Sequence, residues 1–80
     1  MRYRSRTDII ASVLQAANGG VTKTKMMYRA FVSHDQLKDY VYLLVENGLL
    51  EYEEGKFRTT EKGLAFLKAY DQLDEIAMLV

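Results

Sequence analysis

A very short connection between two helical segments restricts the fold of this 80-residue chain more than any other feature. The first of these segments follows the expected N-cap Thr22. The second follows Ser33, which can form a capping box with Gln36, three positions later. Only Phe31 and Val32 are left between them. A connection of this length holds two consecutive helices at a sharp angle, as in a helix-turn-helix.

A third helical segment precedes this pair. Between positions 9 and 17 the apolar residues recur with a period of 3.6, which predicts one buried helix face. Ser5 or Thr7 is the expected N-cap. Gly19 and Gly20 supply the left-handed conformation that ends many helices. The first half of the chain is therefore expected to contain three helices.

The periodicity changes after Gly48, which is the expected end of the third helix. Apolar and polar residues alternate in residues 50–53 and 56–59, on either side of the two-residue turn Glu54-Gly55. Alternation with a period of two around such a turn is typical of a β-hairpin. We therefore predict a mainly helical fold with one small hairpin.

A long apolar stripe marks the last segment, for which Thr60 is the expected N-cap. The stripe consists of Phe66, Tyr70, Leu73, Ala77 and Val80, widened by Ala69, Ile76 and Leu79. Its alternating spacing of four and three is typical of a coiled coil. Residues 60–80 would form a helix about 30 Å long, more than so small a core requires. We predict a domain over 1–59 and a dimerisation helix over 60–80; the alternative is a helix folded back on its own domain.

The composition is that of a soluble globular protein, with 49% hydrophobic and 28% charged residues. No apolar run approaches the roughly 20 residues that span a bilayer. No signal-peptide segment follows the N-terminal arginines. We therefore expect a cytoplasmic protein without a membrane partner.

Residues suited to catalysis are scarce, since the chain has one histidine and no cysteine. Its carboxylates are scattered, so that neither a nucleophile–base pair nor a metal-ligand spacing is formed. The sequence also lacks a glycine-rich phosphate loop. We expect no enzymatic activity, no metal or cofactor and no small-molecule substrate.

Charge is unevenly distributed although the formal net charge is zero. Residues 1–38 hold seven basic and two acidic side chains, a net charge of +5, whereas residues 39–80 hold four basic and nine acidic ones, a net charge of −5. Such a distribution is compatible with a basic surface that binds an anion and an acidic remainder that keeps the protein soluble.

Several separate motifs share a resemblance to one family. They are Arg4–Ile10, Thr22–Tyr28, Ser33 with Gln36-Leu37 and Tyr40, Glu46–Leu50, and Thr60–Gly63 with Phe66-Leu67. In these motifs the chain resembles the small archaeal winged helix-turn-helix DNA-binding proteins. That family includes a Sulfolobus ten-kilodalton chromatin protein and predicted transcriptional regulators.

The resemblance implies a fold and a function. The third helix would be the recognition helix, the hairpin would be the wing, and the last helix would join two copies, commonly as an antiparallel coiled coil. The expected partners are double-stranded DNA and a second copy of the chain. The expected role is that of a dimeric transcriptional regulator or a nucleoid-associated protein.

The outward positions of the third helix are the first candidates for DNA contact. They are His34, Asp35, Lys38, Asp39 and Tyr42. The apolar face of the same helix is predicted to consist of Leu37, Tyr40, Val41, Leu44 and Val45. His34 and Lys38 can donate to phosphate or to guanine acceptors, whereas Asp35 could accept only from a cytosine amino group. The alternative is a solvated helix face of mixed charge.

Further candidates lie on other elements. Lys23, Thr24 and Lys25 begin the second helix, where free backbone N–H groups favour an anion. Arg4 and Arg6 could form a flexible arm on DNA, together with Arg2, or could be an ordinary basic tail. Lys56 and Arg58 share one face of the hairpin and are candidate wing contacts, unless Glu51 and Glu53 neutralise them.

A different function is also compatible with the sequence. The tip of the hairpin is acidic and the net charge is zero. These features favour a winged helix that contacts another protein, for example as an adaptor on the transcription machinery, without binding DNA itself.

Overall fold

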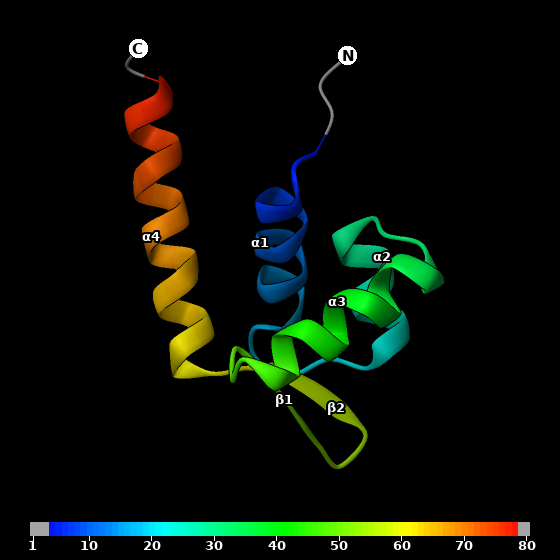
Figure 1. Ribbon diagram of the computed structural model, residues 1–80. Helices are drawn as coiled ribbons and strands as arrows, with labels where there is room; N and C mark the ends of the chain where they lie inside the picture. Colours follow the sequence, from blue (N-terminus) through cyan, green and yellow to red (C-terminus); the bar gives the residue numbers. More distant parts are fainter. Residues whose placement is uncertain (1–3, 79–80) are drawn as a thin grey trace.

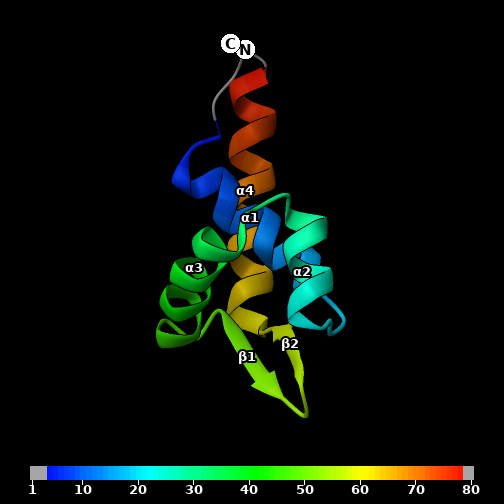
Figure 2. The same ribbon diagram turned by 90° about the vertical axis from the view of Figure 1, so that its right-hand side faces the viewer.

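The computed structural model describes residues 4–78, and within them four helices and one two-stranded sheet (Figure 1). The elements are α1 (Arg6–Ala17), α2 (Lys23–Ala30), α3 (His34–Glu46), β1 (Leu50–Glu53), β2 (Lys56–Thr59) and α4 (Glu61–Met78). This order confirms the predicted winged helix-turn-helix arrangement. Figure 2 shows α2 and α3 on either side of α1, with the hairpin projecting beyond them.

Side-chain caps set the starts of the first three helices. Ser5, rather than Thr7, caps α1 and forms a capping box with Asp8. The hydroxyl of Thr22 accepts from the backbone N–H of Lys25 at 3.3 Å. Ser33 and Gln36 form the predicted capping box at the start of α3. Each of these bonds occupies a backbone donor that has no acceptor inside its helix.

The turn between α2 and α3 depends on an unusual residue. Phe31 adopts the left-handed conformation, with φ 55° and ψ 47°, at a position where glycine is common. Its side chain is 86% exposed. The guanidinium of Arg4 donates to the carbonyl of Phe31 at 2.9 Å and to that of Ala30 at 2.8 Å. Arg4 therefore occupies the carbonyl groups that the end of α2 leaves free.

The hairpin has the predicted strands and turn. Its strands pair antiparallel, with Leu50 opposite Thr59 and Tyr52 opposite Phe57. Glu54 and Gly55 form the turn with φ of 52° and 80°, the left-handed pair that matches the twist of a tight hairpin. On the far side of β2, Val21 forms an isolated antiparallel bridge with Phe57. This bridge fixes the wing to the segment between α1 and α2.

The core lies among α1, α2, α3 and the base of the hairpin. Its fully buried side chains include Val13, Leu14, Met26, Leu37, Leu44 and Leu50. Thr59 is the buried polar residue, and its hydroxyl donates to the carbonyl of Leu14 at 2.6 Å. Among the described residues, every buried side-chain polar atom has a hydrogen-bond partner.

The first half of α4 packs against this core. The hydroxyl of Thr60 accepts from the backbone N–H of Gly63 at 3.1 Å, which confirms the predicted cap. Leu67 is buried, while Phe66 and Tyr70 are half-buried against the core. Tyr70 also donates a hydrogen bond to the carboxylate of Asp8 on α1. These contacts hold α4 beside α1.

The second half of α4 leaves its apolar side chains uncovered. Leu73 is 67% exposed and Ile76 is 59% exposed, and Ala77 is also exposed. Figure 1 shows this part of the helix at the end of the molecule opposite the hairpin. Of the predicted stripe, Val80 lies outside the described residues. None of the helices within residues 4–78 has both the length and the hydrophobicity to cross a bilayer.

Candidate nucleic-acid interface

The first turns of α2 and α3 meet through two side chains. Nζ of Lys23 lies 3.3 Å from Nε2 of His34. A lysine ammonium can only donate, so Nε2 is the acceptor in this contact. Nδ1 in turn faces the carboxylate of Asp35 at 4.0 Å. The contact brings together two predicted DNA-binding residues that are eleven positions apart.

The start of α2 adds further groups that bind anions. Thr24 and Lys25 are exposed beside Lys23. At the start of a helix the first backbone N–H groups have no acceptor within the helix, and the helix dipole places partial positive charge there. A phosphate placed at this point would meet two ammonium groups and free backbone donors.

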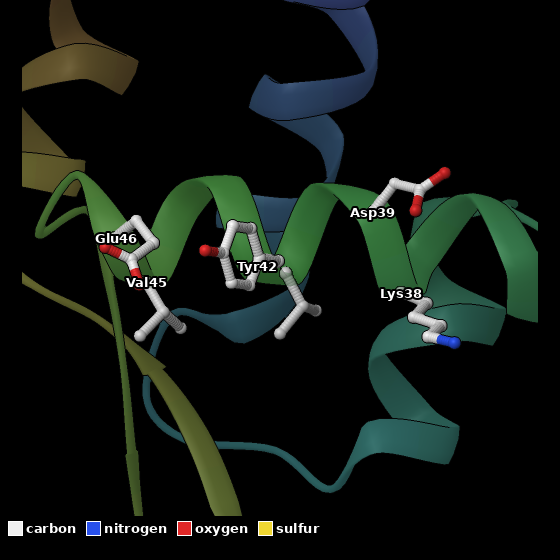
Figure 3. Close-up of a pocket in the computed structure, with 6 residues that line it drawn as sticks. Lys38, Asp39, Tyr42, Val45 and Glu46 are labelled. Atoms are coloured by element: carbon white, nitrogen blue, oxygen red, sulfur yellow. The ribbon is translucent and has the colours of Figure 1, made fainter.

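The exposed surface of α3 has two sides of opposite character. One side carries His34, Lys38, Val45 and the partly buried Val41, and the other carries Asp35, Asp39 and Glu46. Figure 3 shows Lys38 and Val45 pointing toward α2 and the hairpin, whereas Asp39 points the opposite way. Tyr42 lies between the two sides and is 71% exposed. The first side therefore continues the basic surface of α2.

Arg6 lies near the acidic side of α3. It lines a hollow together with Asp39, Tyr40, Tyr42 and Leu43. In this position a guanidinium offsets part of the negative charge of Asp39. Arg6 therefore borders α3, but on the side away from Lys23.

The hairpin separates its charges from its aromatic residues. Arg58 lies opposite Glu51 and Lys56 lies opposite Glu53 in the strand register. Opposite charges at such positions attract each other, which lowers the positive potential of this face. The guanidinium of Arg58 also approaches Gly20. The other face carries Tyr52 and Phe57, whose ring centroids are 4.7 Å apart.

The predicted basic surface is thus only partly assembled. Lys23, Lys25, His34 and Lys38 share one region, while Lys56 and Arg58 lie on a wing face together with three glutamates. Val41 and Val45, which the sequence pattern places on the apolar face of the helix, also line the hollow beside Lys38. Val41 packs partly against the core as predicted, whereas Val45 is 42% exposed. Their spacing of 4, 3 and 4 with His34 and Lys38 was the available signal.

Arg4 has a structural role in addition to any contact with DNA. We predict that Arg4→Ala lowers the free energy of unfolding by about 1 kcal/mol, because two charge-assisted bonds to helix carbonyls are lost at a largely exposed site. Thermal unfolding should show a decrease in Tm of about 4–8 °C for a domain of this size. Arg4→Lys keeps the charge but not the forked geometry, and should recover only part of the loss. An unchanged Tm in Arg4→Ala would show that the Arg4 side chain does not stabilise the fold and instead contacts solvent or a ligand.

No group of three or more His, Asp or Glu side chains within residues 4–78 is arranged to hold a metal ion. The exposed side chains around α2 and α3 can form hydrogen bonds, ion pairs and apolar contacts.

Comparison with known proteins agrees with this geometry. The model of the winged helix-turn-helix family matches residues 3–78. An uncharacterized protein of Methanocaldococcus jannaschii is 31% identical over 77 residues, which cover 94% of this chain and 79% of that protein. The crystal structure of Sso10a-2, a DNA-binding protein from Sulfolobus solfataricus, matches with a TM-score of 0.82 at 22% identity. That match covers 94% of this chain and 83% of the other.

Proposed function

This chain belongs to the winged helix-turn-helix family, and on that basis we propose that it binds double-stranded DNA as a homodimer. Its cellular role would be that of a transcriptional regulator or a nucleoid-associated protein, located with the DNA in the cytoplasm. The observation that carries this proposal is the contact between Lys23 and His34, which joins the anion-binding start of α2 to the start of the recognition helix.

The proposed mode of binding follows from the two helix starts. Lys23 and Lys25 hold phosphates beside the free N–H groups of α2. This fixes the first turn of α3 against the major groove, where His34 and Lys38 can donate to base acceptors. Arg6 and the wing cations Lys56 and Arg58 contribute less, because carboxylates lie close to each of them.

Dimerisation is proposed to use the second half of α4. Ala69, Leu73 and Ile76 follow one another at spacings of four and three, and all are exposed. Phe66 and Tyr70 pack partly on their own domain, and they would form the edge of such an interface. Two subunits joined there would present two basic surfaces, one from each copy, and would bind one duplex at two places.

We predict that the double variant Lys23→Ala, Lys25→Ala weakens binding to all duplexes alike, by at least about tenfold, because two charged contacts with phosphate are lost. Fluorescence anisotropy on random and genomic duplexes at low salt measures this. Lys68→Ala, on the exposed surface of α4, removes a similar charge away from the site and should bind like the wild type. Equal losses in both variants would show that only the overall charge matters.

The acidic side of α3 favours a second candidate function. Asp35, Asp39 and Glu46 line the helix that would enter the groove, and this arrangement also suits contact with a basic protein. An adaptor of this kind would show no DNA affinity even at low salt and would bind one protein partner in a fixed ratio. The same anisotropy titration therefore separates the two functions.

A further inference from the structure

We propose that the C-terminal half of α3 gives DNA binding a preference for A·T base pairs, through contact of Val41, Tyr42 and Val45 with thymine methyl groups. This inference rests on the proposed function, since it concerns how the same surface discriminates among duplexes.

The donors and the apolar groups of the basic side of α3 are separated along the helix. His34 and Lys38 lie in its first half, and Val41 and Val45 lie in its second half. Val45 is 42% exposed and Tyr42 is 71% exposed, although both are large apolar or aromatic side chains. They line an open hollow with Lys38, Asp39, Val41 and Glu46 (Figure 3).

The position of this hollow fits a base edge. Lys38 borders it at one end, one helical turn from His34 and its contact with Lys23. Phosphates held at the start of α2 would therefore set the depth and register of α3 in the groove. Val41 and Val45 are one turn apart, about 6 Å along the helix at 1.5 Å per residue. This length corresponds to about two base pairs at 3.4 Å each.

The chemistry of the hollow distinguishes the base pairs. In the major groove an A·T pair presents the thymine methyl group and the adenine amino group, whereas a G·C pair presents two guanine acceptors and a cytosine amino group. Val41, Val45 and the ring of Tyr42 offer apolar contact to a methyl group. The carboxylates of Asp39 and Glu46, which border the hollow, can accept from the amino group of adenine or of cytosine, so the methyl group is what distinguishes the two pairs here. An A·T pair therefore satisfies both the apolar floor and the acidic border.

The test removes the methyl group alone. Binding of the full chain to an alternating A·T duplex is compared with binding to the same duplex containing deoxyuridine in place of thymidine, which keeps every hydrogen-bonding group. Burial of a methyl group is worth about fourfold in affinity, so two contacted methyl groups should make the thymidine duplex about 16-fold tighter. An alternating G·C duplex should gain affinity in the same way when its cytosines carry a 5-methyl group.

Two variants complete the experiment. The double variant Val45→Ala, Tyr42→Ala changes exposed side chains and leaves Val41 in place, so the thymidine duplex should be only about fourfold tighter than the deoxyuridine duplex. Lys23→Ala should weaken binding to both by the same factor and keep the methyl effect. Equal binding of the two duplexes by the wild type, with salt-sensitive affinity retained, would overturn this inference alone. Absence of binding to every duplex would overturn it together with the proposed function.

Discussion

Gly63→Ala should lower the free energy of unfolding by about 3 kcal/mol, the upper end of the cost of overpacking a well-packed core. For a domain of 80 residues the total stability is only about 4–12 kcal/mol. The corresponding decrease in Tm is about 12–24 °C. Thermal unfolding followed by circular dichroism measures it directly.

The cause is the close approach of α4 to the start of the hairpin. A Cβ atom at Gly63 would overlap the carbonyl oxygen of Leu49 and would lie 2.6 Å from Cγ2 of Thr59. The carbonyl of Leu49 also accepts from the backbone N–H of Thr60 at 3.1 Å. Neither a rotamer change nor a small side-chain movement relieves an overlap with backbone, so α4 would have to move away from the core.

The expected destabilisation is opposite in sign to the usual effect of Gly→Ala in a helix, which makes the prediction specific. At an exposed helix position Gly→Ala stabilises a protein by about 0.5–1 kcal/mol, since alanine has less backbone freedom to lose. The control is Ala65→Gly, at an exposed position of the same helix outside the Ala69, Leu73, Ile76 stripe, which should cost about 1 kcal/mol by propensity alone. A higher Tm for Gly63→Ala than for the wild type would contradict the close packing of α4 against Leu49 and Thr59.

The double variant Leu73→Asp, Ile76→Asp should be a monomer, whereas the wild type should be a dimer. Each of these side chains contributes about 1.5–3 kcal/mol when it is buried, and a symmetric interface buries both of them in each subunit. Their replacement therefore removes about 6–12 kcal/mol from association. Light scattering coupled to size-exclusion chromatography should give the mass of two chains for the wild type and of one chain for the variant.

Folding of the variant is not expected to change, because both residues are more than half exposed in the single chain. Lys68→Glu is the matched control, since it makes the same change in charge at an exposed position of α4 outside the Ala69, Leu73, Ile76 stripe. It should remain dimeric. A wild type that is monomeric at micromolar concentration would contradict the proposed use of α4.

Local signals predicted most of the fold. Ser33 with Gln36, Thr22 and Thr60 cap the helices as expected, because each satisfies backbone donors within a few residues of its own position. The Glu54-Gly55 turn was equally clear, because a two-residue hairpin requires positive φ at both positions. Signals of this kind depend on neighbours in the chain rather than on tertiary contacts.

The sequence pattern does not indicate contacts between residues that lie far apart in the chain. The bonds of Arg4 to Ala30 and Phe31 join positions 26 and 27 residues apart, and no spacing in the sequence indicates them. The apolar stripe of α4 is one continuous repeat, yet Phe66 packs on its own core while Leu73 is exposed. Periodicity shows that a face is apolar, but it does not show which surface covers it.

The candidate site was predictable only in part, because local signals indicate its residues but tertiary contacts decide their exposure. Lys23 and His34 were selected from their places at helix starts, and their contact follows from the short turn between α2 and α3. Val45 was assigned to the apolar face of its helix, and the structure leaves it 42% exposed because the hairpin passes beside α3 without covering it.

The central claim is that Lys23 and Lys25 bind DNA phosphates, and the salt dependence of affinity tests it most directly. For the wild type the logarithm of the association constant should fall linearly with the logarithm of salt concentration, by about 0.9 for each phosphate neutralised. The variant Lys23→Ala, Lys25→Ala should bind with a slope that is shallower by about 2 for each subunit in contact with the duplex. A slope identical to that of the wild type, or no binding at the lowest salt concentration, would contradict the claim.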